Sequence, residues 1–360
     1  MTLSHEVGVA ADTQVEPASP PDPALLPENV QLLLLITSKW VAQSIYVVAE
    51  LGIADLVTEG PQSVEVLAEA TDSHARSLHR FMRVAASVGV LAETFNGEFV
   101  STPLSDLLRS DVPGSLRSFA RMMNADFTWV PYGDVLHTVR TGEVAFARRT
   151  GKRNMFEWFA DHPAEEAIFN EAMTGLTHDS ADSIARSWPF SAGTTIADLG
   201  GGEGLLLSAI LRATPGATGL LFDRPEVVDA ARCRLASAGL GERSRCVGGD
   251  LFTSVPEGAD VYILKSVLHD WDDDECRLIL TNVRRACTKR GARLLVIEPV
   301  IPPLNEWDFG KLMDIEMMVN VGGRERTEPE WRDLFTSAGF MLSAIHDTTP
   351  PVWILEGVVR

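Results

Sequence analysis

Apolar residues are spaced differently in the two halves of the chain. Over residues 30–51 they recur with a helical period and cover much of the circumference, which predicts a long helix that needs a partner surface. Shorter helical patterns follow over 63–91 and join near 71–74, with Ser73 placed to cap the second. Together with a strand over 98–103, these elements predict a winged helix-turn-helix.

Residues 113–190 continue as helices rich in aromatic and methionine side chains. These side chains either form ordinary helical core or partly line a pocket for an aromatic substrate, and the pattern leaves both readings open. They are Phe119, Met122, Met123, Phe127, Trp129, Phe156, Trp158, Phe159, Phe169 and Met173.

From Gly193 onward, short β-rich runs alternate with helical patterns. This alternation predicts a mostly parallel sheet with helices on both faces. The last two runs have no long helix between them, so we expect an antiparallel hairpin at one edge. The predicted strands are 195–199, 218–222, 245–247, 260–264, 293–298, 341–346 and 352–359; the clearest helices are 225–238 and 272–288.

These patterns predict an α/β protein with four regions. Residues 1–26 are rich in Pro, Ala, Asp and Glu and are predicted to form a disordered tail. A winged-helix dimerisation domain is expected over 27–112 and a helical linker that contributes to the substrate pocket over 113–190. A ligand-binding catalytic domain is expected over 191–360.

The helix-turn-helix also suggests a DNA-binding regulator, because Arg76, His79, Arg80 and Arg83 fall on its second helix. The chain, however, carries 31 Lys and Arg against 50 Asp and Glu, a formal net charge of −19 that repels nucleic acid and anionic lipid. We therefore favour a homodimer and expect no nucleic-acid or membrane partner. With no uninterrupted run of 18 apolar residues and no leader pattern, a cytoplasmic protein is expected.

A glycine-rich turn follows the first strand of the predicted sheet. Residues 196–204 read Ile-Ala-Asp-Leu-Gly-Gly-Gly-Glu-Gly, with a carboxylate at Asp198 and glycines that include Gly200 and Gly202. Such glycines let the backbone turn sharply and approach a ligand. The dinucleotide fingerprint needs a glycine at its sixth position, where this chain has Leu205 or Leu207, so a nicotinamide-dependent enzyme is disfavoured.

Acidic residues end the next two strands. Asp223 is placed to accept both hydroxyls of a ribose, and Asp250 precedes Leu251 and Phe252, which suit a purine face. Each aspartate alone could be an ordinary helix cap or a residue of a local loop. Their regular spacing puts them at one edge of the sheet, where open α/β folds bind ligands.

His269 lies just past the fourth strand, at the same edge. Glu298 ends the fifth strand, and Glu325 follows in a Gly-Gly-Arg-Glu-Arg-Thr run. An imidazole flanked by carboxylates is oriented and made more basic, as a general base requires. The competing interpretation of Glu325 is an ion pair with Arg324 or Arg326. The four cysteines form no C-x-x-C pair, and the acidic run 272–274 is expected to begin a helix, so no metal site is indicated.

Five motifs together resemble the plant-type small-molecule O-methyltransferases, a family that includes caffeic acid, hydroxyindole and bacterial antibiotic-pathway enzymes. The motifs are residues 196–204, 222–223, 249–252, 264–271 and 322–327. The resemblance implies a homodimer built by the N-terminal half and a Rossmann-like half that binds S-adenosylmethionine and releases S-adenosylhomocysteine. It also implies no metal and a role in secondary-metabolite or antibiotic biosynthesis.

The resemblance also implies roles for individual residues. It places Asp198, Gly200, Gly202, Asp223, Asp250, Leu251, Phe252, Lys265 and Ser266 at the cofactor. It assigns His269 as the catalytic base, with Glu298 and Glu325 beside it. It places Met173, Asp270 and Asn320 along the pocket of the methyl acceptor.

The expected reaction is an in-line displacement. His269 would remove the proton from a phenolic or enolic hydroxyl of a small aromatic or polyketide acceptor, and the oxygen would then attack the methyl group. Nitrogen or carbon methylation remains an alternative. So does non-methylating polyketide tailoring, such as hydroxylation or decarboxylation, although the retained histidine favours methyl transfer. The sequence leaves the acceptor and its regiochemistry open.

Overall fold

The computed structural model describes residue 22 and residues 25–360 as two compact units, which divide between Asn124 and Ala125. Each unit is described here by itself. The tail expected over 1–26 lies mostly outside the described residues.

The N-terminal unit joins a long helix to a small winged module. Its core is formed by one face of α1 (Glu28–Glu50) together with α2 (Ile53–Leu56), α3 (Val64–Ala70) and α4 (Ala75–Ser87). The short strands form an antiparallel sheet in the order β1-β3-β2. The remaining elements are β1 (Gln62–Ser63), β2 (Ala92–Glu93), β3 (Glu98–Val100), α5 (Pro103–Asp106) and α6 (Arg117–Asn124).

The predicted cap of the second winged-module helix is wrong. α4 begins after His74, and Ser73 instead donates its hydroxyl to the Thr71 carbonyl. Asp72 has a positive φ of 49°, which turns the chain so that Ser73 lies before the helix. The serine that does cap a helix here is Ser63, whose Oγ accepts from the Val66 amide at the start of α3.

α1 leaves most of its apolar surface uncovered. Only Ser44, Val48 and Ala49 are buried, and the helix is the one element among the described residues that is long and apolar enough to cross a membrane by those two criteria. The large apolar side chains exposed on it are Leu32, Leu33, Leu34, Leu35, Ile36 and Trp40. The helix therefore needs a further apolar surface to cover it.

The C-terminal unit opens with helices. They are α7 (Asp126–Trp129), the 3-10 segment η2 (Val130–Asp134), α8 (Val135–Thr141), α9 (Ala145–Thr150), α10 (Met155–Phe159) and the 25-residue α11 (Pro163–Ser187). α11 packs against the first helix of the sheet domain, α12 (Leu205–Ala213).

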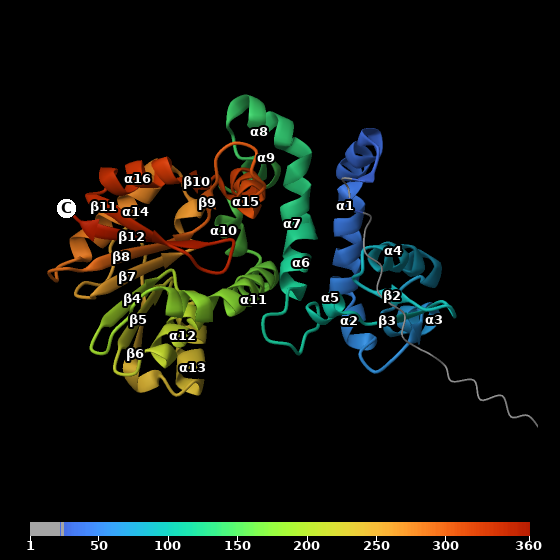
Figure 1. Ribbon diagram of the computed structural model, residues 1–360, viewed down its shortest axis with the longest axis horizontal. Helices are drawn as coiled ribbons and strands as arrows, with labels where there is room; N and C mark the ends of the chain where they lie inside the picture. The colour runs from blue at the N-terminus through green and yellow to red at the C-terminus, as the bar shows by residue number, and fades with distance from the viewer. Residues whose placement is uncertain (1–21, 23–24) are drawn as a thin grey trace, which may run out of the picture. The chain divides into compact units, whose positions relative to one another are not determined.

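A seven-stranded sheet in the order β11-β12-β8-β7-β4-β5-β6 forms the centre of this unit (Figure 1). β4 to β8 are mutually parallel, and β11 and β12 form the predicted antiparallel hairpin, which joins the sheet at β8. The strands are β4 (Thr195–Leu199), β5 (Thr218–Asp223), β6 (Ser244–Gly248), β7 (Val261–Lys265), β8 (Arg293–Glu298), β11 (Phe340–His346) and β12 (Trp353–Val359). The mostly parallel α/β sheet is thus confirmed.

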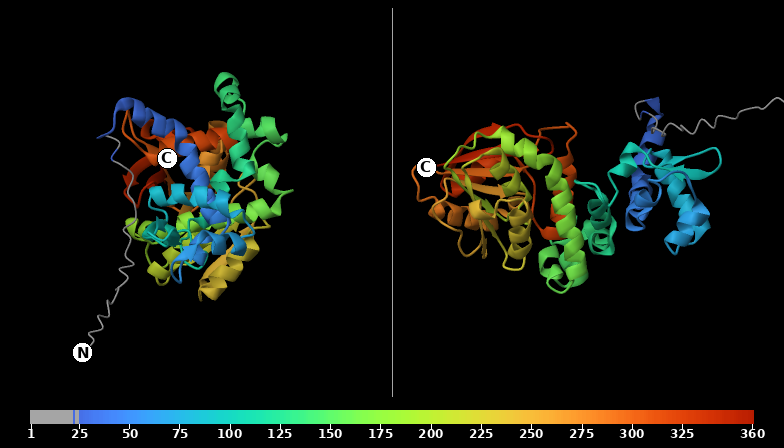
Figure 2. Two further views of the ribbon diagram at one scale, coloured as in Figure 1. Left: turned by 90° about the vertical axis from the view of Figure 1, so that its right-hand side faces the viewer. Right: turned by 90° about the horizontal axis from the view of Figure 1, so that it is seen from below.

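Helices cover both faces of the sheet, as Figures 1 and 2 show. α14 (Asp273–Ala286) and α16 (Glu328–Ser337) pack on one apolar face, and α11, α12 and α13 (Val228–Ser237) pack on the other. The strands are buried on both sides, which explains their continuous apolar runs. The remaining elements are η3 (Gly241–Arg243), η4 (Leu268–Asp270), β9 (Val300–Ile301), α15 (Phe309–Glu316), the π-helical η5 (Met317–Val321) and β10 (Arg326–Thr327).

The strand order reverses at β4. The chain runs from β4 to β5 and β6 on one side, then returns to place β7 and β8 on the other. The loops after β4 and β7 therefore leave the sheet in opposite directions, and the crevice between them is where open α/β folds bind ligands.

The N-terminal cap of α14 gives a test of this local structure. The Asp272 carboxylate accepts a hydrogen bond from the Glu275 amide at 2.8 Å, which confirms that the acidic run begins a helix. We expect Asp272→Ala to lower the free energy of unfolding by about 1 kcal/mol, measured by urea denaturation, because one helix N–H loses its acceptor. Asp272→Asn keeps an acceptor there and should remain close to the parent; an equal loss in both variants would contradict the cap.

Candidate active site

The turn after β4 consists of glycines except for Glu203. Gly200, Gly202 and Gly204 all have positive φ, between 53° and 79°. A Cβ atom at Gly200 would lie 2.7 Å from Cγ2 of Val267, in the loop after β7, so the two loops of the strand-order reversal approach each other closely. Only glycine allows both this backbone conformation and this approach.

The Asp198 side chain is buried at the edge of the sheet, and one of its carboxylate oxygens has no hydrogen-bond donor among the described residues. The side chain is 2% exposed, and its Oδ2 accepts no hydrogen bond within residues 25–360. Burial raises the pKa of Asp198 to about 7, although the positive charge of Lys265 acts against the rise. A buried carboxylate oxygen without a donor is suited to a cationic or hydrogen-bonding ligand group.

Asp223 lies beside Asp198 and is tied to the glycine turn. Its Oδ2 accepts from the Gly202 amide and its Oδ1 from the Arg224 amide, both at 2.7 Å. Burial raises the pKa of Asp223, while these two amide bonds lower it. Each oxygen keeps a second lone pair, so the carboxylate can still accept from a diol.

Asp250 is exposed, and its own loop uses its carboxylate. Oδ1 accepts from the Phe252 amide at 2.9 Å and Oδ2 from the Thr253 hydroxyl at 3.1 Å. Leu251 and Phe252 are partly buried, and the Phe252 ring meets Trp271 edge to face at 4.8 Å. The local-turn interpretation of Asp250 therefore describes the geometry seen, and spare lone pairs remain for a ligand.

Lys265 links the turn to the long helix α11. Its ammonium donates to Oγ1 of Thr177 at 3.1 Å, and the Thr177 hydroxyl donates to the Met173 carbonyl at 2.7 Å. Burial lowers the pKa of Lys265, while Glu298 and Asp198 counteract it. Sequence reasoning missed Thr177, since nothing in a helical pattern distinguishes one threonine from another.

Ser266 is one of three non-glycine residues of the described chain with positive φ, at 52°. Its amide donates to the Ile297 carbonyl at 3.2 Å, which continues the ladder between β7 and β8 for one residue before the chain turns away. Strained residues of this kind are held by their surroundings and concentrate at functional sites.

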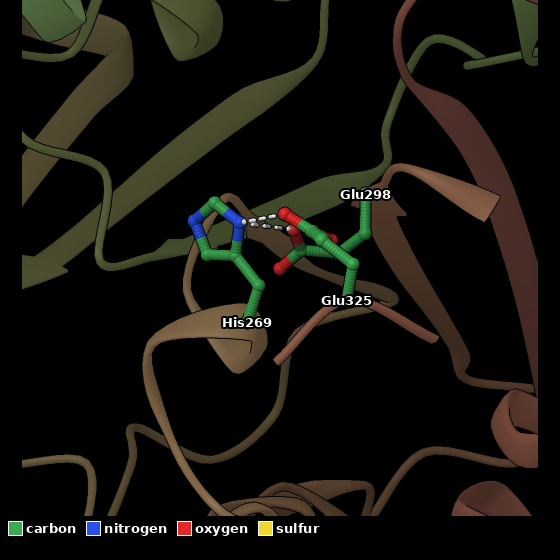
Figure 3. A group of neighbouring side chains, drawn as sticks. All are labelled: His269, Glu298 and Glu325. Atoms are coloured by element: carbon green, nitrogen blue, oxygen red, sulfur yellow. Dashed lines mark hydrogen bonds and ion pairs between the residues drawn. The ribbon is translucent and has the colours of Figure 1, made fainter. Parts of the chain in front are cut away.

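His269, Glu298 and Glu325 come together from three segments of the chain. Nδ1 of His269 lies 2.7 Å from Glu325 Oε1 and 3.6 Å from Glu298 Oε2, while the other ring nitrogen points away from both carboxylates (Figure 3). The two glutamates are 0% and 1% exposed. Glu325 therefore pairs with the imidazole rather than with Arg324 or Arg326, which bind Glu330 and Asp273.

The carboxylates make this imidazole basic. Burial alone would lower the pKa of His269, but the charges of Glu298, Glu325 and Asp270 outweigh it and raise the pKa to about 10. Because Nδ1 donates to Glu325, the neutral ring carries its lone pair on Nε2. The arrangement thus fixes both the tautomer and the direction in which the ring can take a proton.

Asp270 lies near Nε2 of His269, the ring nitrogen that faces away from Glu298 and Glu325. Its Oδ1 is 3.6 Å from Nε2 of His269, and burial raises its pKa to about 7, while the charge of His269 acts against the rise. Asn320, the third residue expected along the acceptor pocket, is fully buried in η5, which packs against η4. Met173 lies on α11, where its carbonyl accepts the hydrogen bond from Thr177.

The same three side chains are the only set in the described chain whose ligand atoms could surround a metal ion, all within 4.8 Å of one another. A metal there would have to displace the proton shared by Nδ1 and Glu325.

Two residues that hold the His269 turn were missed from sequence. Gly323 lies directly on it, since a Cβ atom there would be 1.9 Å from the His269 carbonyl oxygen. The Arg326 guanidinium, 1% exposed, donates to the carbonyls of Leu268 and Trp271, which flank His269 and Asp270. The Gly-Gly-Arg-Glu-Arg run contains both, but the sequence pattern gives no indication that they face the turn after β7.

Some aromatic residues of the helical region 113–190 form core, and at least one lies beside the candidate site. Phe127 and Phe159 are buried and pack edge to face, as core residues do. Phe156 is only partly buried and stacks on Trp271, beside the His269 turn, at 5.9 Å. At least one ring from this region therefore lies next to the site.

Comparisons with known proteins show the family of this chain. Residues 132–341 match the family described as the O-methyltransferase domain, and residues 33–111 match the O-methyltransferase dimerisation domain. The phenazine O-methyltransferase PhzM of Lysobacter antibioticus is 46% identical over 92% of this chain and 96% of its own. The mitomycin biosynthesis 6-O-methyltransferase of Streptomyces lavendulae is 37% identical over 89% and 92%, respectively.

Solved structures give the same result. The crystal structure of LaPhzM has a TM-score of 0.89 at 45% identity and covers 93% of this chain and 100% of that one. NcsB1 from neocarzinostatin biosynthesis, an O-methyltransferase in complex with S-adenosylmethionine and 2-hydroxy-5-methyl naphthoic acid, has a TM-score of 0.78 at 31% identity, over 89% of this chain and 96% of its own.

The charge cluster predicts an unusual titration of His269. We expect its pKa, followed by NMR of the labelled imidazole, to lie well above 6.5 and to fall in Glu325→Gln, because one of the charges that raises it is removed. A folded-state pKa above the unfolded one stabilises the protein fully below pH 6.5, and this contribution is lost as pH rises through about 10. A midpoint at or below 6.5 would contradict the assignment.

Proposed function

Because this chain belongs to the O-methyltransferase family, with its dimerisation and methyltransferase domains, we propose that it methylates a phenolic or enolic hydroxyl of a small aromatic natural product with S-adenosylmethionine. The observation that carries this proposal is the His269 cluster. It fixes a basic Nε2 at the carboxyl edge of the sheet, beside the glycine turn.

The residues around the glycine turn fit the cofactor. Asp198 offers a buried, unpartnered oxygen to an ammonium group, and Asp223 offers spare lone pairs to a ribose diol. Leu251 and Phe252 offer apolar surface for adenine, and Lys265 and Ser266 would close the same site from β7. When bound, S-adenosylmethionine supplies a methyl group activated by its sulfonium charge.

The raised pKa of His269 bears directly on the proton transfer. A phenol has a pKa of roughly 10 and an unperturbed histidine one of roughly 6.5, so an ordinary imidazole would take the proton uphill by about 5 kcal/mol. With the His269 pKa raised to about 10, proton transfer from the phenol to the neutral ring becomes nearly balanced. At neutral pH most of the free enzyme holds a protonated ring, so only the fraction that has lost the Nε2 proton can act as the base. Glu325 holds the ring in place and, with Glu298, stabilises the imidazolium that forms.

The acceptor belongs to the flat aromatic class, by likeness to the relatives. The Lysobacter relative is named for a phenazine, and the NcsB1 structure contains 2-hydroxy-5-methyl naphthoic acid; both compounds have flat aromatic rings. Phe156 and Trp271 beside the His269 turn suit a ring of this kind. This assignment agrees with a role in secondary-metabolite biosynthesis, which the names of the relatives share.

The exposed face of α1 fits a homodimer. Residues 33–111 match a dimerisation domain, and the apolar side chains of α1 that remain uncovered fall within or next to that range. A second copy of the chain would cover them, which accounts for a helix that is as apolar as a membrane span.

Removing the base should stop turnover without loss of the cofactor. We expect His269→Ala to lower kcat with a phenolic acceptor by roughly 10² to 10⁴-fold, measured by mass detection of the methylated product. Calorimetry should show S-adenosylhomocysteine still bound, whereas Asp223→Ala should weaken that binding. Unchanged turnover in purified His269→Ala would refute the assignment of the base.

The pKa of Asp198 predicts a pH-dependent cofactor affinity. Binding an ammonium group favours the carboxylate, so affinity for S-adenosylhomocysteine should hold above the free-enzyme pKa of about 7 and fall by up to roughly tenfold per unit below it. Asp198→Asn should bind weakly with no such dependence, and Asp229→Asn, an exposed carboxylate on α13, should behave as the parent. A flat profile in the parent would contradict the proposed contact.

Dimerisation can be tested on the exposed face of α1. Leu35 is 72% exposed, and Leu35→Glu would bury a charge in the proposed interface, so sedimentation velocity should show a shift toward monomer. Phe95→Glu, at a fully exposed turn between β2 and β3, is the matched control. A parent protein that sediments as a monomer at micromolar concentration would overturn the proposal.

A further inference from the structure

Tyr132, Glu316 and Asn320 form a buried polar network that neither the glycine turn nor the His269 cluster uses. The Tyr132 hydroxyl donates to Glu316 Oε2 at 2.6 Å, and Nδ2 of Asn320 donates to Glu316 Oε1 at 2.7 Å. Glu316 is 5% exposed and Asn320 is 0% exposed. Each oxygen of the Glu316 carboxylate therefore accepts a hydrogen bond from a side chain of this network.

The network determines which way the Asn320 amide points. Its second Nδ2 hydrogen faces the Thr128 carbonyl at 3.5 Å, so both amide hydrogens are directed at acceptors. A flipped amide would place Oδ1 against the same two acceptors, which is repulsive. Burial and the nearby Glu316 charge raise the pKa of Tyr132, so the tyrosine keeps its proton and continues to hold the carboxylate.

The amide oxygen on the other side is left without a donor. Oδ1 of Asn320 is buried, and no group in the described part of the chain donates to it. Asn320 lies in the π-helical segment η5, which packs against η4, the turn that carries His269 and Asp270. A buried amide oxygen is costly to leave unpaired, and π-helical turns often mark ligand sites.

We propose that Glu316 and Tyr132 are positioning residues that hold the Asn320 amide with its oxygen free for the methyl acceptor, so that the enzyme selects acceptors carrying a second N–H or O–H group. The inference rests on the proposed methyl transfer. An ether, a carbonyl or a carboxylate group of the acceptor that lies next to Oδ1 of Asn320 can only accept hydrogen bonds, so its oxygen and Oδ1 would repel each other. A hydroxyl or amine would complete the hydrogen bond that the network leaves open.

The test compares acceptors that differ only in this second group. Each probe is a phenazine with one hydroxyl group to be methylated and one further substituent. The substituent is a hydroxyl, a methoxy or a carboxyl group, and it is placed at each remaining ring carbon in turn. Single methylation is measured by mass spectrometry as kcat and KM separately. For at least one ring position, the parent enzyme should prefer the hydroxyl probe over its methoxy partner by roughly tenfold or more in kcat/KM.

The variants separate positioning from folding. In Glu316→Leu the amide can turn, so the hydroxyl-to-methoxy ratio should fall toward one, mainly through a higher KM for the hydroxyl probe. Glu316→Gln keeps an acceptor for Nδ2 and should restore the preference. Tyr132→Phe removes one of the two donors to the carboxylate and should lower the ratio partway. Calorimetry with S-adenosylhomocysteine confirms that each variant is folded.

The outcomes distinguish the two proposals. Methylation by the parent without a hydroxyl preference at any ring position overturns the inference and leaves the proposed function standing. An unchanged ratio in folded Glu316→Leu and Tyr132→Phe also overturns it, as does a loss in Glu316→Gln equal to that in Glu316→Leu. Failure of the parent to methylate any probe, with S-adenosylhomocysteine bound, refutes the proposed acceptor class and the inference with it.

Discussion

Burial of two carboxylates beside one imidazole is the constraint on which this site depends. Glu298 and Glu325 are almost completely removed from solvent, and a buried charge is tolerated only when it is compensated. The imidazole of His269 supplies a partner to both, and the amides of Val267 and Leu268 donate to Glu298 at 2.9 Å. The compensation that makes the carboxylates tolerable is also what makes the histidine a strong base.

The surroundings of this cluster hold its backbone from two sides. The Arg326 guanidinium binds the carbonyls at both ends of the turn after β7, pairs with Asp273 and lies over the Trp331 ring at 5.2 Å. Gly323 packs on the His269 carbonyl, and the Arg324 amide donates to it at 2.9 Å. The segment after η5 therefore supports the turn after β7 as well as supplying Glu325, and together these contacts hold His269 in place.

The parts of this structure that follow from local patterns could be predicted, and those that depend on distant pairs could not. Alternating strand and helix patterns gave the sheet, and the spacing of Asp198, Asp223 and His269 placed them at one edge, where the structure has them. The Tyr132–Glu316 bond joins residues 184 positions apart, and no periodicity indicates it. Ser73 was misplaced because a single positive φ at Asp72 redirects the chain.

The order of the segments along the chain has a consequence for biosynthesis. The glycine turn and Asp223 follow β4 and end β5, whereas Gly323, Glu325 and Arg326 lie a hundred residues or more later. As the chain leaves the ribosome, the glycine turn emerges first, and His269 has neither its carboxylate partner Glu325 nor its backbone support until residues 323–326 have been made. A nascent chain that stops before Gly322 would lack every contact that orients His269 through Glu325, so the cluster can form only after this segment has been made.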